Sequence, residues 1–200
     1  MTHMKTHIKS YTSDVISADI FDELDCFIKK EIQHDTSPAL ANMGWTEPAG
    51  FLYNVKHQLR WRKDQGCIYV AYDNTRAVAI SCVEHPEGDT SWAIGGIRTW
   101  ITSSYRTQML PSILLNNQMD WAIAKGCAFM LLSFNEYNQG LYSVVKSRAY
   151  QKSKAWSGWW DDCLAVEEPI TIRHTKQWCL IKPLGTNNAD NLEKLLRWAK

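Results

Sequence analysis

The segment from Lys146 to Trp160 brings together side chains that could bind a nucleic acid. Basic and aromatic residues alternate along it: Lys146, Arg148, Tyr150, Lys152, Lys154, Trp156, Trp159 and Trp160. Aromatic rings stack on bases while cationic groups contact phosphates, so this combination is typical of sites for single-stranded nucleic acid. The alternative, which we favour, is a helix with a solvated basic face followed by tryptophans that cover the core.

Several common catalytic motifs are absent from the sequence. There is no G-x-x-x-x-G-K-[ST] loop, no H-E-x-x-H, and no closely spaced pair of Cys or His that could bind zinc. No metal is therefore implied. The six cysteines are scattered without a C-x-x-C pair, and several lie in apolar runs, so we expect buried, reduced thiols.

The composition is that of an ordinary globular protein. With 45% hydrophobic residues and a formal net charge of +1, no overall field would draw the chain to nucleic acid or to an anionic membrane. The N-terminus lacks the apolar stretch of a signal peptide, and about eighteen apolar residues never run together. We therefore expect a cytoplasmic protein without membrane contact, a monomer or a homodimer, that folds as a single domain over residues 1–200.

Helical periodicity predicts two helices before Gly66. The first begins after Ser17, which can cap it, and runs to Ile32. Its apolar face is Ile20, Phe21, Leu24, Phe27, Ile28 and Ile32. A shorter helix is expected over Phe51–Trp61, and the polar stretch 1–16 is expected to be a flexible N-terminus.

Three strands follow. Cys67–Tyr72 and Arg76–Glu84 are rich in β-branched and aromatic residues and flank a turn, which predicts a hairpin. A third strand is expected over Ser91–Ile101. Its internal pair, Gly95 and Gly96, indicates a bulge or a close backbone approach.

The remaining elements alternate between helix and strand. A helix is expected from Pro111 to Gly126, with the apolar face Ile113, Leu114, Met119, Trp121, Ala122 and Ile123. Further elements are a buried strand at Ala128–Phe134, a helix at Leu141–Tyr150, strands at Ile170–Arg173 and Gln177–Lys182, and a closing loop and helix over 184–200. This order predicts an α/β fold with a mixed sheet.

The stretch from Ile101 to Leu115 resembles the motif V-x-P-x-x-R-G-x-G-I-G-x-x-L-L of the GNAT superfamily of N-acetyltransferases. It keeps the length and Ile101, Tyr105, Arg106, Leu110, Leu114 and Leu115. Thr107, Met109 and Pro111 replace the glycines that let loop amides and a helix N-terminus approach the pyrophosphate of coenzyme A. The hydroxyls of Thr102, Ser103, Ser104 and Ser112 could compensate. The alternative is a polar loop that binds no ligand.

A second match lies downstream. The family tends to show N-x-x-A-x-x-L-Y after the next strand, and this chain has Asn135, Leu141 and Tyr142 at those spacings. By the resemblance, Tyr142 is the candidate general acid that protonates the departing thiolate. A partly buried helical tyrosine without a catalytic role is the alternative.

The resemblance implies a mixed, mostly antiparallel central sheet flanked by helices on both faces. It also implies that a backbone amide between Gly96 and Trp100 polarises the thioester carbonyl. The candidate residues for binding acetyl-CoA are Ile97, Thr99, Ile101, Arg106, Thr107, Gln108, Met109, Ser112 and Asn135. The candidate general base is Glu84 at the end of a strand, with His85 as its rival; the alternative is that both are solvated at a hairpin end.

The function implied is transfer of an acetyl group from acetyl-CoA to the amine of an unidentified acceptor. The alternative is an inactive shell of the same fold that binds a protein or a nucleic acid, with the segment from Lys146 to Trp160 as its contact surface.

Overall fold

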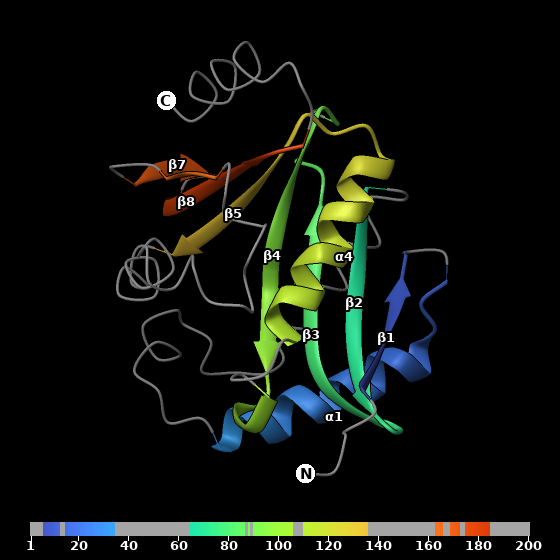
Figure 1. Cartoon of the computed structure of the whole chain (residues 1–200). Coiled ribbons are helices and arrows are strands. Elements are labelled where there is room, and N and C mark those ends of the chain that lie inside the picture. Colours follow the sequence, from blue (N-terminus) through green and yellow to red (C-terminus); the bar gives the residue numbers. More distant parts are fainter. Residues whose placement is uncertain are drawn as a thin grey trace. The chain divides into compact units, whose positions relative to one another are not determined.

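The computed structural model of the chain describes residues 6–12, 15–34, 65–86, 88, 90–105, 110–135, 163–165, 169–172 and 175–184 (Figure 1). Its elements, in chain order, are β1 (Thr6–Tyr11), α1 (Ala18–His34), β2 (Gly66–Asp73), β3 (Arg76–Glu84), β4 (Trp92–Ile101), the 3-10 turn η1 (Ser103–Tyr105), α4 (Leu110–Ala124), β5 (Phe129–Asn135), β6 (Leu164–Ala165), β7 (Ile170–Ile172) and β8 (Thr175–Pro183).

The chain divides into two compact units, each built from two stretches of sequence. The first unit comprises Met1–Glu84 and Ile97–Leu114, and the second comprises His85–Gly96 and Leu115–Lys200. Hydrogen-bonded strands follow the order β1-β2-β3-β4 in the first unit, and β4-β5-β8-β6 with β7 on β8 in the second. The β4–β5 pair is parallel, whereas β1–β2, β2–β3 and the ladders of β8 are antiparallel. The predicted mixed, mostly antiparallel sheet with helices is confirmed.

Helix α1 forms where the periodicity predicts it. The Ile20 amide donates to Ser17 Oγ at 3.4 Å and the Phe21 amide to the Ser17 carbonyl at 3.3 Å, so Ser17 caps the helix. The buried apolar residues of α1 belong to one cluster with side chains from alternating positions of β2 and β3: Phe21, Leu24, Phe27, Ile28, Ile68, Val70, Tyr72, Ile80 and Cys82. Because alternate strand residues share a face, α1 covers one face of this hairpin.

The hairpin of β2 and β3 is confirmed. Asp73 pairs with Arg76, which leaves a two-residue turn in which Asn74 has φ 56°. Asn tolerates this left-handed conformation better than most residues because its side chain can bond locally. Both strands are buried along nearly their whole length, so the hairpin is a rigid base for the groups attached to its ends.

Strand β1 is an element that the sequence reading missed. The stretch 1–16, expected to be flexible, contains a strand that pairs antiparallel with β2 along its full length. An edge strand exposes most of its side chains and therefore lacks the apolar signal of a central strand. His7 stacks on the Tyr72 ring at 5.5 Å, and Lys9 Nζ lies 5.2 Å from the same ring centroid. These contacts hold a polar sequence in a strand.

In the second unit, β5 is the buried central strand that the sequence predicts. It is parallel to β4 over Trp92–Gly95 and antiparallel to β8 over its whole length. Met130, Leu131 and Leu132 are all buried. The predicted strands near 170 and 177 correspond to β7 and β8, while the two-residue β6 is too short to give a sequence signal.

Helix α4 starts at Leu110, so Pro111 lies in its first turn, where a missing N–H breaks no helical hydrogen bond. Gly126, with φ 76°, follows its end. The predicted apolar face is partly wrong, because Ile113 and Ile123 are exposed. The buried side chains of the helix are Leu110, Ser112, Leu114, Leu115, Gln118 and Ala122. The apolar periodicity predicted the wrong face because two of the buried residues, Ser112 and Gln118, are polar.

The helices predicted at Phe51–Trp61, Leu141–Tyr150 and near the C-terminus, and the segment Lys146–Trp160, lie outside the described residues. Cys67, Cys82, Cys127 and Cys179 are buried free thiols as predicted, whereas Cys26 is exposed. Among the described helices, none has the length and apolar character needed to cross a membrane.

Candidate functional site

The structure describes the strand-to-helix turn of the first unit on either side of residues 106–109. β4 ends at Ile101, the Thr102 amide donates to the Val78 carbonyl of β3 at 3.0 Å, and η1 follows. Within η1 the Tyr105 amide donates to the Thr102 carbonyl at 2.8 Å. Helix α4 then begins at Leu110. The sequence places a strand, a short turn and a helix N-terminus in succession, which is the arrangement that presents backbone amides to an anion.

Two hydroxyls beside this turn are buried. Thr102 is 8% and Ser112 is 7% exposed, and neither Thr102 Oγ1 nor Ser112 Oγ has a hydrogen-bond partner within the described residues. A buried hydroxyl left unpaired costs about 1–3 kcal/mol, so such groups call for an explanation. A ligand that accepts hydrogen bonds would supply one.

The electrostatics of the helix start also favour an anion. No acidic side chain lies in the first turn of α4, so nothing there cancels the positive end of the helix dipole. Pro111 removes one backbone donor from the same turn. The described residues therefore fit a phosphate-bearing group such as coenzyme A, with side-chain hydroxyls in place of part of the usual amide set.

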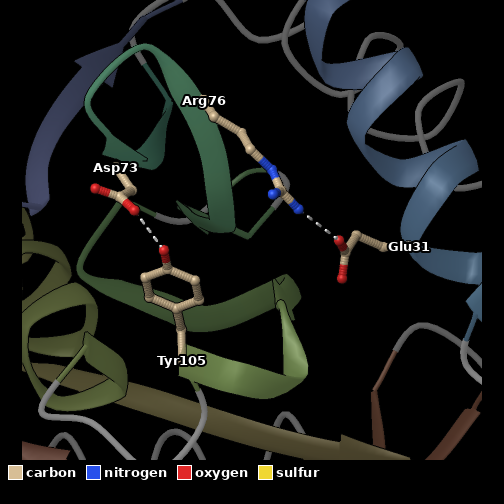
Figure 2. Close-up of polar contacts among 4 residues, drawn as sticks. All are labelled: Glu31, Asp73, Arg76 and Tyr105. Carbon is tan, nitrogen blue, oxygen red and sulfur yellow. Dashed lines mark hydrogen bonds and ion pairs between the residues drawn. The ribbon is translucent and has the colours of Figure 1, made fainter. Parts of the chain in front are cut away.

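Tyr105 is tied to the β2–β3 hairpin. Its hydroxyl donates to Asp73 Oδ2 at 2.6 Å, as Figure 2 shows. This hydrogen bond, together with burial, raises the pKa of Tyr105 above its ordinary value. In the same view Arg76 reaches Glu31 of α1, with 3.7 Å between guanidinium and carboxylate. The tyrosine hydroxyl therefore keeps its proton at neutral pH and acts as a donor.

The predicted binding residues of β4 are only partly described. Thr99 is exposed and its hydroxyl bonds that of Ser81 in β3, whereas Ile101 is buried. Ile97 is placed by its backbone in β4. All three belong to the first unit together with Ser112.

Of the other predicted acetyl-CoA-binding residues, the structure describes Asn135 alone. Asn135 ends β5 in the second unit, opposite Gln177 of β8. Arg106, Thr107, Gln108, Met109 and Tyr142 lie outside the described residues.

Glu84 and His85 are not solvated, so that alternative is wrong. Glu84 ends β3 and is 6% exposed. His85 is also buried; its Nδ1 lies 2.9 Å from the Trp92 carbonyl, to which it can only donate, and its ring lies 4.9 Å from that of Trp121. This contact engages only Nδ1 of His85, so the choice between Glu84 and His85 as the general base stays a prediction.

Gly95 and Gly96 mark the close approach that the sequence predicts. Gln118 of α4 is wholly buried, and its Oε1 accepts the Gly96 amide at 2.7 Å. A Cβ on Gly95 would lie 2.8 Å from Met130 Sδ and 3.0 Å from Gln118 Oε1. Gly96 has φ 69°, a conformation that glycine adopts freely. The pairing of β4 with β5 ends at Gly95, and the next amide of β4, that of Gly96, donates to the Gln118 side chain.

The sequence reading missed Gln118 and the pair Tyr105–Asp73. A signal for Gln118 was present, because it lies four residues from both Leu114 and Ala122 on the buried side of α4. A polar residue on such a stripe needs a polar partner, and Gly95–Gly96 indicated where a backbone would come close. Nothing in the local sequence pairs Tyr105 with a residue thirty-two positions earlier.

Comparison with known proteins shows the fold. No family model matches the chain, and no curated protein is significantly similar to it in sequence. A GNAT-family acetyltransferase from Streptococcus pneumoniae aligns over 90% of this chain and 100% of its own, with 15% identity and a TM-score of 0.58. A GNAT-family protein from Desulfovibrio desulfuricans aligns over 90% of this chain and 99% of its own, with 6% identity and a TM-score of 0.61. The ribosomal-protein-S18-alanine N-acetyltransferase of Escherichia coli aligns over 92% of this chain and 97% of its own, with 12% identity and a TM-score of 0.53. The chain therefore has a GNAT-like fold.

Proposed function

We propose that this chain is an N-acyltransferase that moves an acetyl group from acetyl-CoA to the amine of an acceptor. The observation that carries the proposal is the strand-to-helix turn of the first unit. There, two buried hydroxyls without a described partner, Thr102 Oγ1 and Ser112 Oγ, border a helix start free of acidic residues. The GNAT-like fold supports a donor of this class.

In this proposal the turn binds the phosphates of the donor. Arg106 contributes a guanidinium suited to bidentate phosphate contacts. Thr107, Gln108 and Met109 contribute backbone amides, and Ser112 contributes its hydroxyl. The backbone of β4 at Ile97, Thr99 and Ile101 binds the arm that carries the acetyl group. The resemblance assigns Asn135 to the binding of the same arm. Binding along this line orients the thioester for attack and lowers the entropic part of the barrier.

The acceptor amine must lose a proton and the leaving thiolate must gain one. Glu84, buried at the end of β3, is the proposed general base, acting directly or through a water molecule. Tyr142 is the proposed general acid. Each turnover leaves Glu84 protonated and Tyr142 deprotonated, and proton exchange with the solvent restores both groups.

Isothermal titration of the purified protein with acetyl-CoA tests the proposal. We expect binding that weakens about tenfold or more in Arg106→Ala, because a charged hydrogen bond to phosphate is lost. Lys125→Ala, which removes one exposed positive charge from the other end of α4, is the matched control. If the wild-type protein does not bind acetyl-CoA at millimolar concentration, the proposal is wrong.

Thr102→Val and Ser112→Ala sharpen this test. Each removes a buried hydroxyl with little change of shape, so the free protein should keep or gain thermal stability while acetyl-CoA binding weakens several-fold. Loss of stability in both variants, with binding unchanged, would assign the hydroxyls to the fold and not to the ligand.

A second candidate function is a binding shell without activity. The Gly96 amide, one of the β4 groups that the resemblance assigns to the thioester carbonyl, is bonded by Gln118. In this case the partner is a protein or a nucleic acid, with Lys146–Trp160 as the contact surface. Trp159→Ala would then abolish partner binding, and acetyl-CoA would give no response in the titration.

A further inference from the structure

We propose that Tyr105 and Asp73 are positioning residues that fix the entrance of the phosphate-binding turn. Tyr105 immediately precedes Arg106, and Asp73 lies at the turn of the β2–β3 hairpin. The inference rests on the proposed function and adds to it a pair of residues that touches no substrate.

The contact is a strong hydrogen bond of defined geometry. The Tyr105 hydroxyl donates to Asp73 Oδ2 at 2.6 Å, and Asp73 Oδ1 accepts from Asn74 Nδ2 at 3.3 Å. Figure 2 shows the ring of Tyr105 pointing its hydroxyl at the carboxylate. Hydrogen bonds to a charged acceptor are shorter and about twice as strong as neutral ones. Both carboxylate oxygens are engaged, so the acceptor is itself held in place.

The hairpin that carries Asp73 is a fixed support. Its turn has only two residues, and its strands are buried on both faces. Arg76, directly after the turn, pairs with Glu31 of α1 at 3.7 Å (Figure 2). Because Arg76 is largely exposed, this ion pair adds little stability by itself. It nevertheless joins the hairpin end to the helix that covers the hairpin.

Tyr105 is fixed from its other side as well. The Thr102 amide bonds Val78 of β3, and the Tyr105 amide bonds the Thr102 carbonyl. The short turn is therefore attached to β3 at its start and to the hairpin end at its finish. The position of Tyr105, the residue before Arg106, is therefore fixed by contacts within the protein.

Such preorganisation favours binding of the phosphate-bearing end of the donor and not of the end that carries the acetyl group. Ordering a loop at the moment of binding costs conformational entropy, which a prefixed entrance reduces. The saving applies to ligands that use the phosphate-binding turn. It does not apply to a donor that carries the acetyl group on pantetheine without the nucleotide and the phosphates.

This difference supplies the test. For Tyr105→Phe we expect the KM of acetyl-CoA to rise about tenfold with kcat unchanged, since one charge-assisted hydrogen bond is removed. The kcat/KM for acetyl-pantetheine should stay at the wild-type value. Tyr11→Phe is the matched control, because it removes a buried tyrosine hydroxyl that bonds Tyr72 at 3.2 Å in the same unit. The control should leave both donors unaffected.

Asp73→Asn keeps the inference testable if Tyr105→Phe folds poorly. Asp73→Asn should raise the KM of acetyl-CoA by a smaller factor, because an amide oxygen is a weaker acceptor. In the double variant, Tyr105→Phe should raise this KM by a smaller factor than it does in the wild-type protein. Equal losses with both donors, or a KM that does not change, would overturn the inference while the proposed function stands. Failure of the wild-type protein to bind acetyl-CoA would overturn both.

Discussion

Two regions of the chain differ in their use of glycine: β4 has the pair Gly95–Gly96, whereas the turn between Ile101 and Ser112 has no glycine. In β4 both glycines are present, and the chain's own buried atoms, Gln118 Oε1 and Met130 Sδ, occupy the space that a Cβ on Gly95 would enter. In the turn, positions that the resemblance assigns to glycine hold Thr107, Met109 and Pro111. Close approach to a protein group favours glycine, whereas under the proposed function the turn would approach its ligand with side-chain donors in place of glycines.

The largest expected effect tests the first half of this comparison. Gly95→Ala should destabilise the protein by about 2 kcal/mol, since the ends of the Met130 and Gln118 side chains must shift within fully buried surroundings. Urea unfolding followed by circular dichroism measures the loss. Gly126→Ala is the comparison variant: nothing lies within 4 Å of its Cβ, so only the left-handed backbone opposes it, and about 1 kcal/mol is expected. Equal losses in the two variants would refute the steric account.

A smaller effect tests the second half. Pro111→Ala restores a backbone donor in the first turn of α4, where a non-proline residue is tolerated. Unfolding free energy should fall by less than about 1 kcal/mol, because the change acts mainly on the unfolded chain. Affinity for acetyl-CoA, measured by calorimetry, should rise a few-fold if helix amides face the donor phosphates. An unchanged affinity would mean that hydroxyls and Arg106 account for the phosphate contacts.

A further effect concerns pH and involves groups in both units. Burial raises the pKa of Cys179 in the second unit to about 12, and the hydrogen bond to Asp73 raises the pKa of Tyr105 in the first. Each group has a folded pKa above its unfolded value, so its contribution is fully present below the unfolded pKa and is lost as pH rises through the folded one. Stability should therefore fall as pH rises from about 9 toward 12.

Two variants measure the shares of Cys179 and Tyr105 in that loss. Burial and the hydrogen bond to Tyr11 also raise the pKa of Tyr72, which contributes to the remainder. Cys179→Ala should flatten the fall from about pH 9 upward, and Tyr105→Phe from about pH 10 upward. Urea unfolding at a series of pH values gives both slopes. A slope that neither substitution changes would show that other groups dominate the alkaline loss.

Local signals predicted much of the described fold. Ser17 and the spacing of Phe21, Leu24 and Ile28 are enough to place α1, and Asp73–Asn74 between two apolar runs places the hairpin. β1 escaped because an edge strand needs no apolar alternation. On α4, Ile113 was assigned to the wrong side because Ser112 and Gln118 are buried polar residues.

The site was predictable only where the chemistry is local. The turn from Ile101 to Ser112 could be proposed as a site from hydroxyl clustering and the resemblance. The side chain of Glu84 is buried, and its role as a general base stays a prediction. The partners of Gly96 and Tyr105 are contacts between distant positions, Gln118 and Asp73. Such pairings depend on how helices and hairpins pack, which residue spacing along one element does not encode.

The short parallel ladder of β4 and β5 has a consequence for the order of folding. Only Trp92–Gly95 and Phe129–Leu132 pair in it, and the long stretch of chain between them, which includes α4, must close before the two strands can meet. The β2–β3 hairpin closes through two residues and can form within microseconds. Contacts between distant residues are formed late because loop closure must come first. We therefore expect the parallel pair to be among the last structures formed, and its transition-state φ-values to be low.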